Sequence, residues 1–251
     1  MRFDVITLFE PMFSALLEHG ITGRALKRNL FEFQAWNPRD FTTDVHRTVD
    51  DRPYGGGPGM VMLAEPLLAA VSAVREKAPA TRFVLPSPHG VRYDQKVLLE
   101  LSQSLAITFI CGRYEAIDQR FIDIVQPLQV SMGDFVVSGG ELPAMIMMDS
   151  LIRRLPGAVN TAGSVTEDSF EAGLLDCSHY SRPESLGAMK VPGVLLSGHH
   201  SNIAKWRREQ MLAQTLSRRP ELIAALFDDM KSSDKAYLLS IGYNGRLSSS
   251  E

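Results

Sequence analysis

Two hydrophobic periodicities alternate along the first two-thirds of the chain. Short apolar runs rich in β-forming residues, such as 107–111, precede or follow segments with apolar residues at helical spacing, such as 64–77. The pattern predicts strands over 3–9, 31–36, 82–85, 107–111 and 129–132, and helices over 11–18 (with Gly20 as its C-cap), 23–29, 64–77, 94–104, 117–125 and 142–154. This alternation indicates an α/β fold with a mainly parallel sheet flanked by helices on both faces.

The periodicity disappears over the small, polar residues of 160–168 and returns in a different form. A turn-rich stretch over 176–200 is followed by predicted helices over 202–216, 220–230 and 235–241. We therefore expect a large domain over 1–159, a flexible linker over 160–169 and a small helical domain over 170–251.

Composition and charge narrow the class of protein. With 45% apolar and 22% charged residues, the 251-residue chain is globular, which excludes a disordered tail or a disulfide-stapled miniprotein. The two cysteines, Cys111 and Cys177, form no CxxC pair, and no apolar run reaches the roughly 20 residues of a membrane helix. We expect a soluble, cytoplasmic protein that does not bind membranes.

The charge is distributed unevenly between the two predicted domains. The net charge of -3 argues against an indiscriminate RNA binder, yet residues from 171 onward hold 10 Lys and Arg against 9 Asp and Glu. Five of these cations cluster along one predicted helix: Lys205, Arg207, Arg208, Arg218 and Arg219. This pattern fits either a local nucleic-acid contact or a solvated helix face.

Four segments combine glycines with polar residues. They are 50–60, which has four glycines, 111–118 directly after a predicted strand, 131–144 before a helix, and 167–170, which contains an acid pair. Open α/β sheets bind ligands at the carboxyl ends of strands, so the second and third segments are candidates for a ligand site. Plainer roles stay open for each: a tight surface loop, a helix N-cap at Asp118, an ordinary strand–loop–helix junction, and solvated acids.

Several common catalytic motifs are missing from the sequence. It has no P-loop, no dinucleotide GxGxxG frame, no HExxH and no GxSxG. The pair His199 and His200 has no cysteine or acid at metal-ligand spacing, so we assign no metal there.

Taken in order, the four segments resemble the bacterial tRNA (guanine-N1)-methyltransferases, the TrmD family of the SPOUT superfamily. The resemblance rests on 51–60, 111–115, 133–143 and 167–170, and it extends from residue 3 to residue 207. The chain departs from the family at Ala116, where Gly is usual, and at Phe135, where Tyr is usual.

The resemblance implies a particular fold and donor site. The parallel sheet would contain a deep trefoil knot, S-adenosyl-L-methionine (AdoMet) would bind in the knotted loops, and two chains would form a homodimer that shares its active sites. The large domain would bind AdoMet and the small one tRNA. The implied AdoMet pocket comprises Leu85, Pro86, Ser87, Gly112, Tyr114, Glu115, Ser131, Met132, Gly133, Asp134, Phe135, Val136, Val137, Gly139, Gly140 and Pro143.

The resemblance also implies methylation of N1 of the guanosine immediately 3′ of the tRNA anticodon (position 37). Guanine N1 carries a proton at neutral pH, so the reaction needs a base, and the charge that develops on O6 needs a cation. Asp168 matches the family's general base and Arg153 its guanine-contacting cation, with Mg²⁺ expected near Glu115. The expected tRNA contacts are His46, Arg47, Gly57, Gly59, Lys205, Arg207 and Arg208. An RNA-binding adaptor without catalysis and a SPOUT enzyme acting on a ribose 2′-hydroxyl or a different base are the alternatives.

Overall fold

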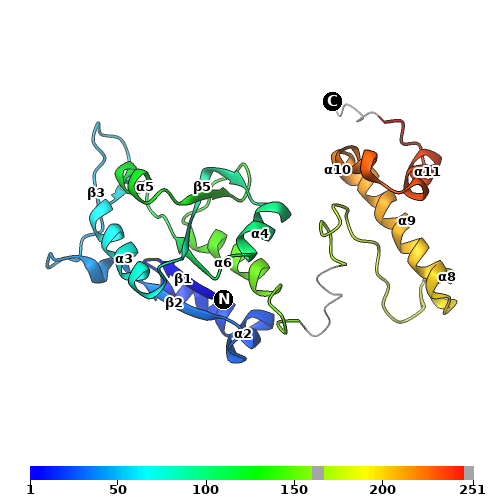
Figure 1. Cartoon of the computed structure of the whole chain (residues 1–251), viewed down its shortest axis with the longest axis horizontal. Helices are drawn as coiled ribbons and strands as arrows, with labels where there is room; N and C mark the ends of the chain where they lie inside the picture. The colour runs from blue at the N-terminus through cyan, green and yellow to red at the C-terminus, as the bar shows by residue number, and fades with distance from the viewer. Residues whose placement is uncertain (160–166, 246–251) are drawn as a thin grey trace. The chain divides into compact units, whose positions relative to one another are not determined.

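The computed structural model describes residues 1–159 and 167–245. The chain divides into two compact units, Met1–Ala162 and Gly163–Glu251, and each is described by itself (Figure 1). Most of the predicted linker over 160–169 lies outside the described residues, so its flexibility stays a prediction.

The first unit is built on a five-stranded sheet in which every pair of neighbouring strands is parallel. The strand order is β2-β1-β6-β5-β8, with β1 at Arg2–Ile6, β2 at Glu32–Trp36, β5 at Arg82–Arg92, β6 at Ala106–Ile110 and β8 at Leu128–Ser131. Every residue of β6 is buried, as its four apolar residues predict for a strand covered on both faces, and the hydroxyl of the fifth, Thr108, pairs with that of Thr81 at 2.8 Å. The predicted α/β class with a parallel sheet is confirmed.

Helices cover both faces of this sheet (Figure 1). Side chains of β1 alternate, so Phe3 packs in one buried cluster with Met147 of α6, whereas Ile6 packs in another with Leu67 of α3. The helices and 3-10 turns of this unit are η1 Glu10–Phe13, α1 Ser14–Leu17, α2 Gly20–Lys27, η2 Pro38–Phe41, α3 Ala64–Lys77, α4 Gln95–Ser102, α5 Gln119–Val125 and α6 Glu141–Ile152. Helices α4 and α6 pack together on the first face, and α3 and α5 pack together on the second.

Side-chain caps explain where two of these helices begin. The Asp94 carboxylate accepts a hydrogen bond from the backbone N–H of Val97 at 3.0 Å, at the start of α4. The Asp118 carboxylate accepts one from the backbone N–H of Arg120 at 2.9 Å, at the start of α5. Asp118 is therefore a helix N-cap, the plainer of the two roles that its sequence context allowed.

The N-terminal elements differ from the predicted ones in three ways. Strand β1 ends at Ile6 rather than at residue 9, because Thr7 turns its hydroxyl to a buried carboxylate of α6. The predicted helix over 11–18 is a 3-10 turn followed by one helical turn that ends at Leu17. Gly20 is not its C-cap but the first residue of α2, where a φ of +65° turns the chain between the two helices.

Strand β5 extends to residue 92 rather than ending at the predicted residue 85, and it pairs twice with β8. Pro86 and Val91 both lie opposite Val130, because the register shifts between them. The intervening residues 87–90 form a bulge between the two pairings. Residues 86–90 contain two prolines and a glycine and lack strand periodicity, so the hydrophobic pattern predicted too early an end for this strand.

Gly90 lies against the backbone of β8 at this bulge. An added Cβ would lie 2.2 Å from the carbonyl carbon of Gln129 and from the nitrogen of Val130. We expect Gly90→Ala to lower the free energy of unfolding by about 2–3 kcal/mol, because one strand must move to admit the methyl group. Urea unfolding followed by circular dichroism measures this. Gly193→Ala is the control, since a Cβ there meets nothing within 4 Å. Equal unfolding midpoints for the two variants would contradict the prediction.

The second unit is mainly helical. Its elements are the hairpin β9 Ser185–Leu186 and β10 Met189–Lys190, then α8 Gly193–Leu196, α9 His200–Arg218, α10 Pro220–Leu226, η3 Phe227–Asp229 and α11 Ser232–Ser240. Leu174, Leu212, Ile223, Leu238 and Tyr243 form its buried core. Within the described ranges, no helix of either unit combines the length and the apolar character needed to span a bilayer.

Candidate functional site

A bulge and two loops of neighbouring strands lie at the carboxyl edge of the parallel sheet. Strand β5 lies between β6 and β8, so the bulge that begins after Pro86 within β5 and the loops after Ile110 and Ser131 lie at the same edge. The structure thereby brings together the three predicted groups 85–87, 112–115 and 131–137. The edge is where this class of sheet binds ligands.

The loop after β6 is fixed to the glycine-rich segment 50–60. The backbone N–H of Glu115 donates to the carbonyl oxygen of Met60 at 2.9 Å. The next two residues form β7, Ala116–Ile117, which pairs with β4, Val61–Met62, beside β3, Asp50–Asp51. Two motifs that lie more than 50 residues apart in the sequence therefore form one surface.

Tyr114 occupies a strained position in this loop. Its φ is +61°, an uncommon conformation for a residue with a side chain. Its hydroxyl interacts with Asp50 and Arg39. Partial burial raises the pKa of the Tyr114 phenol above its usual value, and the hydrogen bond to Asp50 raises it further. The phenol is thus neutral near pH 7 and able to donate a hydrogen bond.

A buried ion pair closes the site beneath the loops. The Arg113 guanidinium donates from Nε to Glu141 Oε2 at 2.8 Å, and the Thr7 hydroxyl donates to Glu141 Oε1 at 2.8 Å. The Glu141 side chain is 0% exposed, at the first turn of α6. Arg113 also donates to the carbonyl oxygen of Ser138 at 3.1 Å and stacks over the Phe9 ring at 4.4 Å. The sequence pattern did not predict the Glu141 interaction, although the signal, a glutamate at the start of an apolar helix, is visible in the sequence.

Gly139 and Gly140 are required by close approaches to this network. A Cβ on Gly139 would lie 2.3 Å from Arg113 Nε, and one on Gly140 would lie 2.8 Å from the Cα of Cys111. The backbone N–H of Gly140 donates to the carbonyl oxygen of Gly112 at 2.9 Å. The start of α6 is therefore fixed directly to the loop after β6.

Cys111 is excluded as a nucleophile at this edge. The side chain is buried, and burial raises the pKa of its thiol well above the usual value, with Glu141 adding to the effect. The thiol consequently stays protonated near pH 7.

The segment after β8 carries uncovered apolar side chains. Phe135 is 60% exposed and Val136 is 85% exposed, and Val137 is exposed as well. Leu142 and Ile146 are exposed on α6, whose opposite side packs into the core. A helix that is apolar on both sides usually has a covering surface on both sides.

The two predicted catalytic residues belong to different units. Arg153 caps the carboxyl end of α6 in the first unit. Asp168 lies in the second unit, in a turn where its carbonyl oxygen accepts from the backbone N–H of Glu171 at 3.3 Å. Both side chains are partly buried.

The predicted RNA-contacting residues of the first unit lie in exposed loops. His46 and Arg47 are exposed, and Arg47 is held by an ion pair with Asp40. Gly57 and Gly59 have positive φ values of 114° and 81° in the glycine-rich loop. The same loop fully exposes Tyr54, whose ring could stack on an RNA base. The expected RNA contacts do not include Tyr54, although its position between Pro53 and Gly55 in a turn-forming segment is a signal of exposure.

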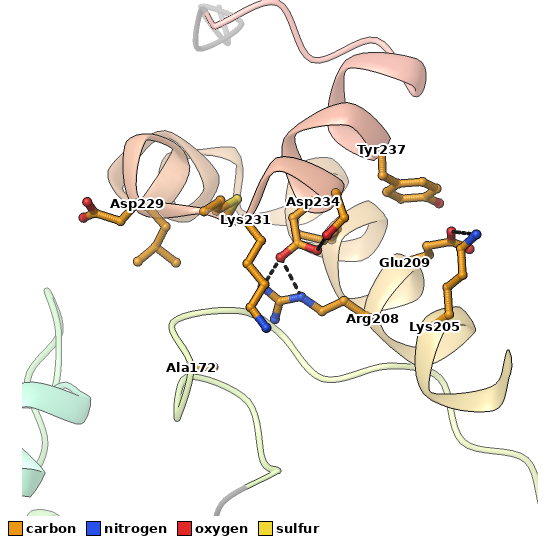
Figure 2. Close-up of a pocket in the computed structure, with 12 residues that line it drawn as sticks. Ala172, Lys205, Arg208, Glu209, Asp229, Lys231, Asp234 and Tyr237 are labelled. Atoms are coloured by element: carbon orange, nitrogen blue, oxygen red, sulfur yellow. Dashed lines mark hydrogen bonds and ion pairs between the residues drawn. The ribbon is translucent and has the colours of Figure 1, made fainter. Parts of the chain in front are cut away.

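The basic residues of α9 differ in their exposure and in their ion pairs. Lys205 and Arg207 are exposed. Arg208 instead points to Asp234 of α11, with Nη2 and Nε at 2.7 and 3.1 Å from Oδ2, beside an open pocket of about 690 Å³ (Figure 2). Its charge is therefore neutralised within its own unit, and Lys205 is also paired, at 3.8 Å from Glu209 Oε1 on the same helix.

Glu115 is the residue expected near Mg²⁺. Its carboxylate is exposed beside Gly59, where a Cβ would lie 3.2 Å from Oε2. It joins no cluster of three metal-ligating side chains among the described residues. One carboxylate completed by waters and substrate oxygens is a common arrangement for Mg²⁺, so the residue fits such an ion.

Comparison with known proteins identifies the family. The family model described as "tRNA (Guanine-1)-methyltransferase TrmD" matches residues 1–225, which include parts of both units. The chain belongs to this family. The resemblance inferred from the four segments is confirmed, and with it the assignment as a tRNA (guanine-N1)-methyltransferase.

Similar proteins match along nearly the whole chain. A tRNA (guanine-N(1)-)-methyltransferase of Burkholderia vietnamiensis is 51% identical over 248 residues, covering 96% of this chain and 94% of the relative. One of Ralstonia nicotianae is 56% identical over 227 residues, covering 90% and 87%. One of Burkholderia mallei is 49% identical over 256 residues, covering 99% and 97%.

Proposed function

We propose that the enzyme transfers a methyl group from AdoMet to N1 of the guanosine immediately 3′ of the tRNA anticodon, position 37. The observation that carries this proposal is the convergence of the bulge in β5 with the loops after β6 and β8 at one sheet edge. In a methyltransferase family, this edge is the natural place for a donor of AdoMet type.

The donor site would be formed mainly by backbone groups. Gly112, Gly139 and Gly140 let the backbone of two loops approach closely, and Tyr114 and Glu115 border the same edge. We include a trefoil knot at this edge in the proposal. This part of the proposal rests on membership of the family, for which the resemblance implies a knot.

The chemistry requires a base rather than activation of the donor. AdoMet supplies a methyl group on a sulfonium, which already leaves readily. The Asp168 carboxylate would take the N1 proton of guanine as the N1–CH₃ bond forms and the CH₃–S bond breaks. The Arg153 guanidinium would balance the negative charge that develops on O6. Glu115 would hold Mg²⁺ with oxygen ligands from water and substrate.

The tRNA would contact both units. The target guanine must leave its stack to reach the donor, so recognition would depend on loop shape and backbone contacts. His46, Arg47 and the glycine-rich loop in the domain over 1–159 would provide some contacts. Lys205 and Arg207 in the domain over 170–251 would provide others, with residues 160–169 as the linker.

We also propose that two chains form a homodimer. The uncovered Phe135, Val136 and Val137 lie directly before α6, which exposes Leu142 and Ile146. Covering these side chains with a second copy would remove apolar surface from water next to the proposed donor site.

The position of the methyl group tests the proposed function. The enzyme is incubated with tritiated AdoMet and tRNA transcripts that carry guanosine or adenosine at position 37, and the products are digested to nucleosides for mass spectrometry. We expect 1-methylguanosine from the first transcript and no transfer to the second. A 2′-O-methylated nucleoside would indicate a ribose methyltransferase, and binding of tRNA without transfer would indicate an adaptor.

A further inference from the structure

A cluster of potential metal ligands lies in the second unit, within the segment that follows Asp168. Among the described residues, Asp176, Cys177 and His179 form the group of three such side chains whose ligand atoms all lie within 4.8 Å of one another. None of the three has a role in the proposed methyl transfer. They combine a carboxylate, a thiol and an imidazole.

The chemistry of this set favours a borderline transition ion. Thiolate and imidazole ligands suit Zn²⁺ and similar ions, whereas Mg²⁺ takes oxygen ligands. A tetrahedral Zn²⁺ with bonds of about 2.0–2.3 Å separates its ligand atoms by roughly 3.3–3.7 Å. The ligand atoms in the structure lie within 4.8 Å of one another, and the His179 side chain, which is 70% exposed, must turn slightly to reach that spacing.

A backbone hydrogen bond fixes the Asp176 side chain, and Asp176 in turn contacts His179. The N–H of Cys177 donates to Asp176 Oδ1 at 2.6 Å, which folds the carboxylate over the cysteine and directs Oδ2 toward His179 Nε2 at 2.8 Å. The Cys177 side chain is buried, and His179 borders an open pocket of about 690 Å³. One side of the cluster is therefore rigid, and the other admits an ion and a water molecule.

Two further hydrogen bonds attach this segment to α9. The backbone N–H of Leu175 donates to Thr215 Oγ1 at 2.9 Å, and Gln214 Nε2 donates to Ser178 Oγ at 2.8 Å. Such preorganisation lowers the ordering cost of metal binding.

We propose that Asp176, Cys177 and His179 bind a zinc-class divalent ion, with water as the fourth ligand. Asp176 contributes Oδ2 and neutral His179 contributes Nε2, with its proton on Nδ1. Cys177 contributes its sulfur, and its S–H proton is released to solvent as the metal–sulfur bond forms. The ion replaces the direct contact between Asp176 and His179.

The site also adjoins the turn that carries the proposed base. The backbone N–H of Asp176 donates to Ser169 Oγ at 2.9 Å, and Ser169 follows Asp168 directly. A bound ion would hold this turn in place, a consequence that rests on the proposed function, whereas the binding itself does not.

Cobalt provides the direct test. Untagged full-length protein, stripped with a chelator, is titrated with Co²⁺ alone, and the thiolate-to-cobalt charge-transfer band is followed in the near ultraviolet. We expect a band that saturates at one ion per chain, persists in excess Mg²⁺ and disappears when Zn²⁺ is added. Absence of the band would overturn the proposal.

Variants assign the ligands. Cys177→Ser is expected to abolish the band, and Asp176→Asn and His179→Gln to weaken Co²⁺ binding by at least about 10-fold. His199→Gln, a change of another exposed histidine, should leave the titration unchanged. A band that survives in Cys177→Ser would arise from Cys111 and would overturn the assignment. Methyl transfer is measured separately, so failure of either proposal is distinguishable from failure of the other.

Discussion

The Asp168→Asn enzyme is expected to transfer methyl groups about 10²–10⁴-fold more slowly than the wild type, the usual contribution of a positioned general base. Asparagine keeps the size of the side chain and its capacity for hydrogen bonds, but it cannot take the N1 proton. The backbone turn at this residue uses the carbonyl oxygen, which the substitution retains. Single-turnover assays with saturating tRNA and tritiated AdoMet measure the chemical step.

Glu167→Gln is the matched control for this prediction. It removes the same charge from the adjacent, exposed residue, and we expect a rate within about twofold of the wild type, as for surface substitutions generally. Calorimetric titration should give the same AdoMet affinity for all three proteins, because the proposed donor residues lie in the first unit. An Asp168→Asn enzyme with the wild-type rate would refute the assignment of the base.

The sequence predicted the sheet because local patterns determine it. The four apolar residues of β6 require cover on both faces, and that requirement is visible without any knowledge of their neighbours. The glycines of the site were also visible, although their reasons were not. Only the structure shows that Gly139 makes room for Arg113 and that Gly140 packs on Cys111.

Features that depend on distant residues could not be predicted in this way. Glu141 is buried because it meets Thr7, which lies 134 positions earlier, and no local pattern encodes that contact. Whether the Arg208 guanidinium can contact RNA depends on its ion pair with Asp234, 26 positions later. The second half of β5 forms because β8 pairs with it across a proline-rich stretch of low strand propensity. The assignment of Asp168 and Arg153 came from the family resemblance alone.

The ion pair beneath the site is expected to dominate the stability of the first unit. Glu141→Ala should lower the free energy of unfolding by about 3–5 kcal/mol, because it leaves Arg113 buried without its counter-charge and Thr7 without its acceptor. Urea unfolding at constant salt measures the loss. Glu100→Gln is the control, because it breaks the solvent-exposed ion pair with Arg82 and should cost no more than about 1 kcal/mol.

A double-mutant cycle separates the ion pair from the other contacts of the two residues. Arg113→Met keeps an apolar stem near Phe9 but removes the charge, so the double variant Arg113→Met/Glu141→Ala contains neither member of the pair, and the cycle compares it with Arg113→Met and Glu141→Ala alone. We expect it to be more stable than the sum of the single losses predicts, by about 0.5–3 kcal/mol. AdoMet affinity should fall in each single variant, since the pair fixes Ser138 and the start of α6 to the loop after β6. Strict additivity of the two losses would show that the charges act independently and that the loops are held by their backbone contacts instead.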